Sequence, residues 1–394
     1  MSKDTTLRIV ATDYSGLKVG SPVAAYWGQL ASGFEQRYPH IKIEVQFVPV
    51  ERANEEVAAM VKAGNIPDMA QLDSYSGFAA EDRLYSADAL FPISMQSDFI
   101  PSLAKAGSVK RTQYGIPWVA STRMLFYNKK LFAEAGIKKA PRTWAEIKRA
   151  AVKLKENGVP VPFGLPLGPQ ESEAETMLWM LGNDGGYTDA SGAYTFDSAS
   201  NVKTFTWLKN NLVEPGLVGP NDPARTNVAD AFGQFLAGRT GMLNGHMTVL
   251  RRAKGAGIDI GVAPLPGLAG LSARTLGNAD WIMAFKEPGH LEADAAFMRY
   301  VYSPENMLKF HQGNKLLPVT ADTSQAVRSL PDEKVLLPFL QRLPDAAFFP
   351  VNKPSWVPVS AELRKNIGRA VHGDPKSVLT NLQSYAESVE NTMP

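Results

Sequence analysis

The chain has 394 residues, which is enough for about two or three domains and a large core. Its 41 Lys and Arg residues and 39 Asp and Glu residues leave a formal net charge of +2, which argues against a protein that binds nucleic acid chiefly through the phosphate backbone. The absence of cysteine excludes disulfides, thiolate nucleophiles, iron–sulfur clusters and Cys-ligated zinc.

The hydropathy pattern is that of an ordinary globular protein. Hydrophobic residues make up 44% of the chain and charged residues 20%, and no run of about 18 apolar residues occurs. Residues 1–6 lack the basic, apolar and small-residue pattern of an export leader, but a mature protein whose leader had been replaced by a start codon would begin in the same way. The first residues therefore carry no information about export.

The first part of the chain has the pattern of an α/β unit. Ser21 followed by Pro22 suits the N-cap and first residue of a helix, and the alternation of apolar and polar residues over 41–47 predicts a strand. The predicted elements are a strand over 7–11, a helix over 21–38, a strand over 41–47, a helix over 51–63 and a strand over 69–72. This order predicts a parallel sheet.

A second region begins near residue 114 and is richer in helices. Thr143 and Glu146 have the spacing of a capping box, which predicts a helix that ends at 157–158. The other predicted elements are a strand over 124–127, helices over 202–212, 229–236, 292–302 and 360–371, and β-like segments over 241–243, 258–263 and 282–285. No repeat and no long polar linker occurs, so two lobes would be joined by short crossovers.

Metal and nucleotide motifs are absent. No two of the five histidines are four residues apart, and there is no phosphate loop, dinucleotide fingerprint or nucleophile elbow. We therefore expect no metal and no cofactor. An enzyme stays open, because the paired carboxylates of glycoside hydrolases have no fixed spacing. The best local candidates are Glu171, Glu173 and Glu175, which we interpret more simply as the solvated start of a helix.

Polar and aromatic residues occur together in predicted loops. One group is Asp13, Tyr14 and Ser15 after the first strand, and another is Asp73, Ser74 and Tyr75 after the third. Ligands bind at such carboxyl ends of strands, although the same residues also cap turns. Asn278, Asp280 and Trp281 form a third group, in which Trp281 suits a core position equally well. Carboxylates and amides bond sugar hydroxyls while a ring covers the C–H face, so this mixture is typical of sugar recognition.

A set of short segments along nearly the whole chain carries a family resemblance. The segments are 34–45 (FEQRYPHIKIEV), 64–68 (GNIPD), 114–132 (YGIPWVASTRMLFYNKKLF), 135–137 (AGI), 141–147 (PRTWAEI), 235–245 (FLAGRTGMLNG), 263–267 (APLPG) and 314–319 (NKLLPV). Because the segments occur in this order and at these spacings, the chain resembles the extracellular solute-binding proteins of ABC importers, in the carbohydrate-binding group similar to maltose-binding protein.

The resemblance implies an α/β, two-lobed periplasmic-binding-protein-like fold with a hinge and an interlobe ligand cleft. Lobe one would hold residues 1–118 and 282–318, and lobe two residues 119–281 and 319–394. A ligand that contacts both lobes would favour the closed form, which an ABC permease in the membrane would recognise. The resemblance further implies a monomer that is periplasmic or extracellular, tethered or free, and not an enzyme.

The resemblance also implies a set of ligand-binding residues from both lobes. The set is Asp13, Tyr14, Ser15, Asp73, Ser74, Tyr75, Trp118, Ser121, Arg123, Glu171, Glu173, Asn244, His246, Asn278, Asp280, Trp281 and Trp356. Trp118, Trp281 and Trp356 would be stacking platforms, whereas Trp27, Trp144, Trp179 and Trp207 lie at helical positions that favour the core. His246 stands where the family often has an aromatic residue, which disfavours a long maltodextrin-like ligand.

Three functions therefore stay open at this point. The leading one is delivery of a small saccharide or sugar derivative to an importer, and its rival is a glycoside-processing enzyme acting on an oligosaccharide. A carrier of an acidic or phosphorylated solute is the third, motivated by Arg123 and His246. The Arg123 guanidinium must be matched either by a protein carboxylate such as Asp73 or Glu173, or by an acidic ligand.

Overall fold

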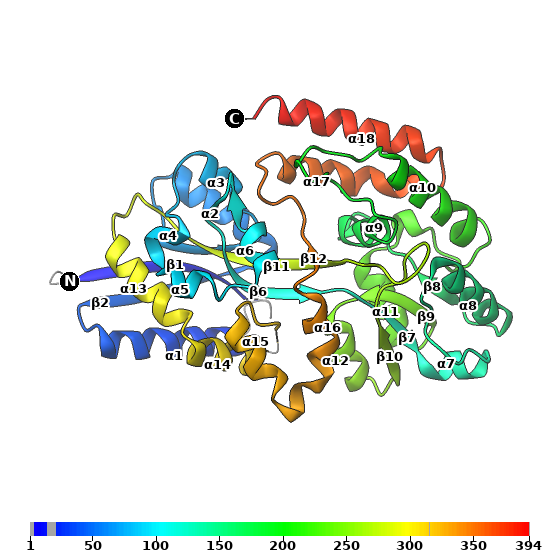
Figure 1. The fold of residues 1–394 in the computed structure, drawn as a ribbon, viewed down its shortest axis with the longest axis horizontal. Coiled ribbons are helices and arrows are strands. Elements are labelled where there is room, and N and C mark those ends of the chain that lie inside the picture. Colours follow the sequence, from blue (N-terminus) through cyan, green and yellow to red (C-terminus); the bar gives the residue numbers. More distant parts are fainter. Residues whose placement is uncertain (1–3, 14–20, 315, 394) are drawn as a thin grey trace. The chain divides into compact units, whose positions relative to one another are not determined.

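The computed structural model of the chain describes residues 4–13, 21–314 and 316–393 (Figure 1). The chain divides into two compact units, each built from discontinuous segments. Unit 1 comprises Met1–Ser121, Asn278–Leu340 and Val351–Pro354, and unit 2 comprises Thr122–Gly277, Gln341–Pro350 and Ser355–Pro394. The predicted α/β class is confirmed, since each unit combines a sheet with helices.

Unit 1 is organised around a β-sheet. Its strands are β1 (Thr5–Asp13), β2 (Ile41–Pro49), β3 (Met69–Leu72), β6 (Ile116–Thr122) and the larger part of β11 (Thr275–Ala284). The order is β11, β3, β1, β2, and β6 also pairs with β11. β1 runs parallel to β2 and β3, as predicted, because helices connect these strands. β11 enters from a distant part of the sequence and runs antiparallel to β3.

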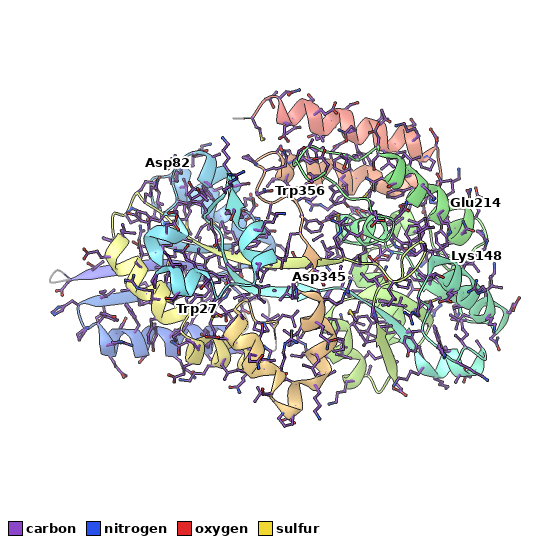
Figure 2. The ribbon with its side chains drawn as sticks, in the orientation of Figure 1. Trp27, Asp82, Lys148, Glu214, Asp345 and Trp356 are labelled. Atoms are coloured by element: carbon purple, nitrogen blue, oxygen red, sulfur yellow. The ribbon has the colours of Figure 1, made fainter. Side chains whose placement is uncertain are left out.

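The first helix, α1 (Pro22–Arg37), shows how the sequence specifies an element of unit 1. Ser21 is its N-cap and accepts a hydrogen bond from the Ala24 N–H at 3.0 Å, as the Ser-Pro pair predicts. Apolar residues at helical spacing form its buried face, including Trp27, which Figure 2 labels and which is 1% exposed. Burial of each large apolar side chain contributes about 1.5–3 kcal/mol, so this face holds α1 in the core of unit 1.

The remaining elements of unit 1 are short helices and one hairpin before the crossover and longer helices after the return. They are η1 (Val50–Arg52), α2 (Ala53–Lys62), α3 (Ser76–Ala80), α4 (Ala87–Leu90), α5 (Ile93–Gln96), α6 (Pro101–Ala106), β4 (Ser108–Val109), β5 (Thr112–Gln113), α13 (Leu291–Val301), α14 (Pro304–Asn314), α15 (Ala321–Arg328), η4 (Pro331–Leu336) and most of α16 (Leu337–Arg342).

The resemblance assigns residues 319–394 to lobe two, but residues 319–340 lie in unit 1. Val319 accepts a hydrogen bond from the Ile100 N–H at 3.0 Å, and the Ala321 N–H donates to the Asp98 carbonyl at 2.7 Å. The segment then continues into α15, which packs against α14. These contacts join positions far apart in sequence, which no local pattern reveals.

Unit 2 is organised around a four-stranded sheet with the order β10, β7, β9, β8. Its strands are β7 (Met124–Asn128), β8 (Val161–Gly164), β9 (Thr240–Gly245) and β10 (Ile260–Ala263), and β12 (Ala346–Ala347) pairs separately with the start of β11. β7 is antiparallel to both of its neighbours, whereas β8 and β9 are parallel. The β-like segments predicted at 241–243 and 258–263 are therefore strands.

The helices of unit 2 cover this sheet and carry the expected tryptophan core. They are α7 (Lys129–Glu134), α8 (Trp144–Glu156), α9 (Ser172–Leu181), α10 (Ala199–Leu208), the π-helix η2 (Lys209–Val213), η3 (Pro223–Arg225), α11 (Val228–Leu236), α12 (Met247–Gly255), α17 (Trp356–Asn366), η5 (Ile367–Val371) and α18 (Pro375–Glu390). Trp144 and Trp179 are buried with ring centroids 5.4 Å apart, and the half-buried Trp207 lies against both.

The predicted capping box of α8 forms only in part. The Thr143 hydroxyl accepts from the Glu146 N–H at 3.1 Å, whereas the Glu146 carboxylate accepts from the Arg142 N–H at 2.7 Å rather than from that of Thr143. Across the described residues, no helix has both the length and the apolar character needed to span a bilayer.

Candidate functional site

Three aspartates of unit 1 stand at the same level at one end of its sheet. Asp13 is the last residue of β1, and Asp73 directly follows β3. Val10 pairs with Ala70 in the parallel register of β1 and β3, so Asp13 and Asp73 stand at the same level. Asp280 belongs to the same level, because β11 is antiparallel to β3 and places its next residue, Trp281, opposite Leu72.

A buried amide joins the three strands just below these carboxylates. Gln71 donates to the Asp280 carboxylate at 3.0 Å and accepts from the Thr12 N–H at 3.3 Å. Asp280 is itself largely buried, so this bond orients its carboxylate. The prediction of site residues missed Gln71, although a polar residue inside the buried strand Met69–Leu72 is a signal that could have identified it.

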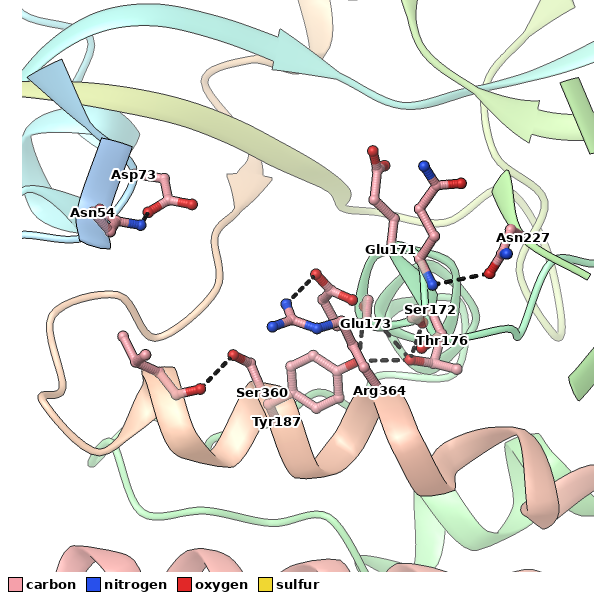
Figure 3. A network of polar contacts seen from close by, with 12 residues as sticks. Asn54, Asp73, Glu171, Ser172, Glu173, Thr176, Tyr187, Asn227, Ser360 and Arg364 are labelled. Carbon is pink, nitrogen blue, oxygen red and sulfur yellow. Dashed lines mark hydrogen bonds and ion pairs between the residues drawn. The ribbon is translucent and has the colours of Figure 1, made fainter. Parts of the chain in front are cut away.

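Asp73 is more accessible than Asp280. Its side chain is exposed, and one carboxylate oxygen accepts a hydrogen bond from the Asn54 amide at the start of α2 (Figure 3). Because both carboxylates are bonded to neutral amides, these partners do not neutralise their charge. Such groups suit a ligand rich in hydrogen-bond donors.

Tyr75 and Trp118 are core residues, which corrects their expected contact with ligand. Burial raises the pKa of Tyr75, whose hydroxyl donates to the Ala106 carbonyl at 2.6 Å. Trp118 is 1% exposed and is surrounded by other rings of unit 1. Its ring neighbours, by centroid distance, are Phe310 at 4.3 Å, Trp27 at 5.4 Å, Tyr302 at 5.8 Å and Tyr26 at 6.2 Å. The Trp118 ring therefore has no exposed face on which a sugar could stack.

The other predicted residues of unit 1 differ in exposure. Asn278 is exposed, whereas Ser74 and Ser121 are half-buried. Trp281 is 1% exposed, and its ring meets the Tyr75 ring edge-on at 5.8 Å. Tyr14 and Ser15 lie outside the described residues.

The candidate residues of unit 2 gather at the start of α9. The interpretation of its acids as a solvated helix end is wrong, because Glu173 is only 9% exposed and Glu175 only 4%. Glu171, just before the helix, has a left-handed backbone with φ of +59°. A non-glycine residue in that region carries strain, which is common at functional positions.

Two ion pairs organise this cluster. Arg123, 7% exposed, donates to the Glu171 carboxylate at 3.1 Å. Arg364 of α17 donates to Glu173 at 3.0 Å, as Figure 3 shows. A protein carboxylate therefore does match Arg123, but it is Glu171 rather than either Asp73 or Glu173. The backbone of Arg123 is held by Thr275, whose hydroxyl donates to the Arg123 carbonyl at 2.7 Å.

Glu175 lies deeper and accepts hydrogen bonds from two neutral donors. Its carboxylate accepts from the Trp179 indole N–H at 2.7 Å and from the Asn244 amide at 2.9 Å. Burial raises the pKa of Glu175 to about 7, against the opposing effect of these two bonds. The side-chain amide of Asn244, a predicted ligand residue, therefore donates a hydrogen bond to a buried carboxylate of the protein.

His246 is a neutral cap of α12. Its Nδ1 accepts from the Thr248 N–H at 3.4 Å, and its ring meets the edge of Phe232 at 5.4 Å. Burial, helped by the positive charges of Arg123 and Arg251, holds the pKa of His246 well below its usual value. The imidazole is thus uncharged at neutral pH and does not attract an anion.

Trp356 opens α17 inside an aromatic cluster of unit 2. Its ring centroid lies 5.4 Å from that of Tyr187 and 5.5 Å from that of Phe349, and the side chain is buried. A surface pocket of about 680 Å³ elsewhere in unit 2 is lined by residues between 220 and 234 and includes no predicted site residue. Within the described ranges, no group of three or more His, Asp and Glu side chains is arranged to hold a metal ion.

The chain is similar to known bacterial solute-binding proteins. Residues 20–308 match the family described as bacterial extracellular solute-binding protein. A binding protein of Brucella abortus is 25% identical over 97% of this chain and 93% of its own length. The sn-glycerol-3-phosphate-binding periplasmic protein UgpB of Salmonella typhimurium is 23% identical over 76% of this chain and 72% of its own length.

A solved structure has the same fold. The sugar-binding protein MalE of Xanthomonas citri superposes with a TM-score of 0.82 at 24% identity, covering 98% of this chain and 97% of that one. The likeness extends over both units of the chain, so the two-lobed fold of periplasmic binding proteins is confirmed.

Proposed function

The chain belongs to the family of bacterial extracellular solute-binding proteins, and from this premise we propose that it captures a small saccharide or sugar derivative for an ABC importer. The observation that carries the sugar assignment is the edge of the unit 1 sheet, where Asp13, Asp73 and Asp280 stand at one level. Sugar hydroxyls donate hydrogen bonds to such carboxylates. The sugar-binding MalE of Xanthomonas citri, which shares the fold, supports this choice.

The mechanism that we propose is closure of a hinge. The ligand contacts residues of both units, so it binds the closed form more tightly than the open form and shifts the population toward closure. A membrane permease recognises the closed form, and the sugar is released to it unchanged. The protein acts as a monomer in the periplasm or at the cell surface, and no step requires a catalytic residue.

A thermal-shift screen identifies the ligand class. Neutral mono- to trisaccharides, their uronic acids and their phosphates are tested on the full chain, because a ligand that binds only the folded state stabilises it by RT ln(1 + [L]/Kd). We expect at least one carbohydrate to raise the melting temperature in a concentration-dependent way. Recovery of that carbohydrate intact after long incubation separates a carrier from the glycoside-processing alternative.

A carrier of a phosphorylated solute is the second candidate, because the chain is similar to UgpB, whose name states that it binds sn-glycerol 3-phosphate. The same screen includes that compound and glycerol. A melting-temperature rise with sn-glycerol 3-phosphate alone would favour this candidate over the saccharide carrier.

Small-angle scattering tests closure. We expect the radius of gyration of the full chain to fall when the best carbohydrate from the screen is added, because the two units approach each other around the ligand. The comparison uses saturating ligand and a sugar that gives no thermal shift as control. An unchanged profile at demonstrated saturation would contradict hinge closure in solution.

Asp73→Ala tests the sheet edge of unit 1. A hydrogen bond to a charged group contributes about 1.5–3 kcal/mol, so the variant should bind the same carbohydrate about tenfold to a hundredfold more weakly. Titration calorimetry measures the affinity, and circular dichroism checks the fold. Asp88→Ala, which changes another exposed aspartate of unit 1 on α4, is the matched control and should bind like the wild type. Equal affinities of all three proteins would remove Asp73 from the site.

A further inference from the structure

We infer that the solute is uncharged, and that Glu171 sets this preference by cancelling the charge of Arg123. The inference rests on the proposed function and specifies the chemical class of its ligand. It concerns the cluster formed by Arg123, Glu171, Glu173 and Arg364 in unit 2.

The cations of this cluster are already matched by protein carboxylates. The Arg123 guanidinium is bonded to Glu171 at 3.1 Å, and Arg364 is bonded to Glu173 at 3.0 Å. A phosphate or uronate ligand would have to displace one of these carboxylates, or lie beside it without a free cation. A neutral hydroxyl avoids both costs, because it donates to a carboxylate oxygen without disturbing the ion pair.

His246 and Glu175, two further groups near Arg123, add no positive charge. His246 uses Nδ1 as an acceptor for the Thr248 N–H, which requires an unprotonated nitrogen there and therefore a neutral ring. Glu175 is bonded to the neutral donors Trp179 and Asn244. Within the cluster of four residues, each guanidinium group is thus paired with a carboxylate.

The candidate residues of unit 1 have the same preference. Asp73, which is exposed, accepts from the neutral Asn54 amide, and Asp280 accepts from the neutral Gln71 amide. Carboxylates accept hydrogen bonds from hydroxyl donors and repel anionic oxygens. Both sets of candidate residues therefore favour a polyhydroxyl ligand without an acidic group.

The backbone next to Glu171 is held by hydrogen bonds to α11. The backbone of Glu171 has the left-handed φ of +59°. The preceding residue, Gln170, forms hydrogen bonds through both its backbone N–H and its side chain. The Gln170 N–H donates to the Asn227 side chain at 3.1 Å, and the Gln170 side chain accepts from the Ala229 N–H at 3.0 Å, both at the start of α11. A strained residue anchored by its neighbour is a specific arrangement, and its effect here is to direct a carboxylate to Arg123.

The experiment compares matched neutral and anionic probes. Glucose and trehalose are paired with glucose 6-phosphate and trehalose 6-phosphate, glycerol is paired with sn-glycerol 3-phosphate, and the best neutral sugar of the screen is paired with its own phosphate. Calorimetry then measures the wild type, Glu171→Gln and the control Glu134→Gln. Glu134 is a half-exposed glutamate of unit 2 that pairs with Lys130 on the surface helix α7.

We expect the wild type and Glu134→Gln to prefer the neutral member of the pair that binds. In Glu171→Gln the affinity for the anionic member, divided by the affinity for the neutral member, should rise by on the order of tenfold. This is the effect of one charge-assisted contact. Glu171→Gly, which tolerates the positive φ and removes the carboxylate, should shift the ratio in the same direction even where Glu171→Gln is unstable.

The outcomes separate this inference from the proposed function. A wild type that binds a sugar phosphate more tightly than the neutral sugar overturns the inference and leaves a solute-binding role. An unchanged affinity ratio in both folded Glu171 variants also overturns it. Absence of any thermal shift with carbohydrates contradicts the saccharide function itself, and the inference falls with it.

Discussion

Replacing Asp294 by asparagine is expected to stabilise the protein strongly at pH 8 and to change little at pH 3. Asp294 lies in the first turn of α13 and is fully buried, and neither of its carboxylate oxygens has a hydrogen-bond partner within the described part of the chain. Burial, together with the negative charge of Asp68, raises the pKa of Asp294 to about 8 from an ordinary value of 3.8.

The sign of the effect follows from proton binding. Between pH 3.8 and about 8 the folded protein holds a proton on Asp294 that the unfolded chain has lost, so the free energy of unfolding decreases as the pH rises through this window. Above the window the loss is complete, with an upper limit of about 6 kcal/mol at 1.36 kcal/mol per pKa unit. Asparagine does not ionise, and the variant should therefore lack this decrease.

Chemical denaturation at several values between pH 3 and pH 9 measures the difference. Glu292→Gln is the matched control, because Glu292 is an exposed acid in the same first turn of α13. Its pH profile should follow that of the wild type. If the profiles of Asp294→Asn and the wild type ran parallel, the carboxyl of Asp294 would not be the group responsible.

Trp281→Ala is expected to lower the free energy of unfolding by about 3–5 kcal/mol, the usual effect of removing a large buried ring. Trp281 is 1% exposed, pairs with Leu72 across β3 and β11, and lies against the ring of Tyr75. The cavity would open beside Gly107, where an added Cβ would lie 3.2 Å from the Trp281 ring. We therefore expect a large fall in melting temperature without any ligand.

Thermal denaturation of the free protein separates the two interpretations of Trp281. Trp281→Phe keeps most of the apolar volume and should lose much less stability than Trp281→Ala. An unchanged melting temperature in Trp281→Ala, accompanied by a large loss of carbohydrate affinity, would instead support the stacking platform that the sequence left open. Calorimetry with the carbohydrate found in the screen provides the second measurement.

The predicted elements of the first part of the chain agree well with the structure. The strands near 7–11, 41–47 and 69–72 and the helix from Pro22 are all present, and the strands are parallel. The helices predicted near 202–212, 229–236, 292–302 and 360–371 are present as well, although the first and last continue into η2 and η5. These elements depend on local periodicity and caps, which neighbouring residues specify.

The candidate site was predictable only in part. That polar residues follow the first and third strands is visible in the sequence, and the topology does place Asp13 and Asp73 at one level. The burial of Glu173 and Glu175 and the role of Gln71 were not visible. A side chain's burial depends on what packs over it, and here the covering elements are remote in sequence.

The sequence by itself determined the α/β class, the family and most of the elements, because periodicity, caps and motif order are local properties. Only the tertiary structure decided that Arg123 pairs with Glu171, that Arg364 reaches Glu173 across 191 positions, and that residues 319–340 belong to unit 1. Charge pairing and burial arise when the chain brings distant residues together. The energy of an ion pair depends on the distance between its charges and on their exposure to water, and neither quantity is contained in a local pattern.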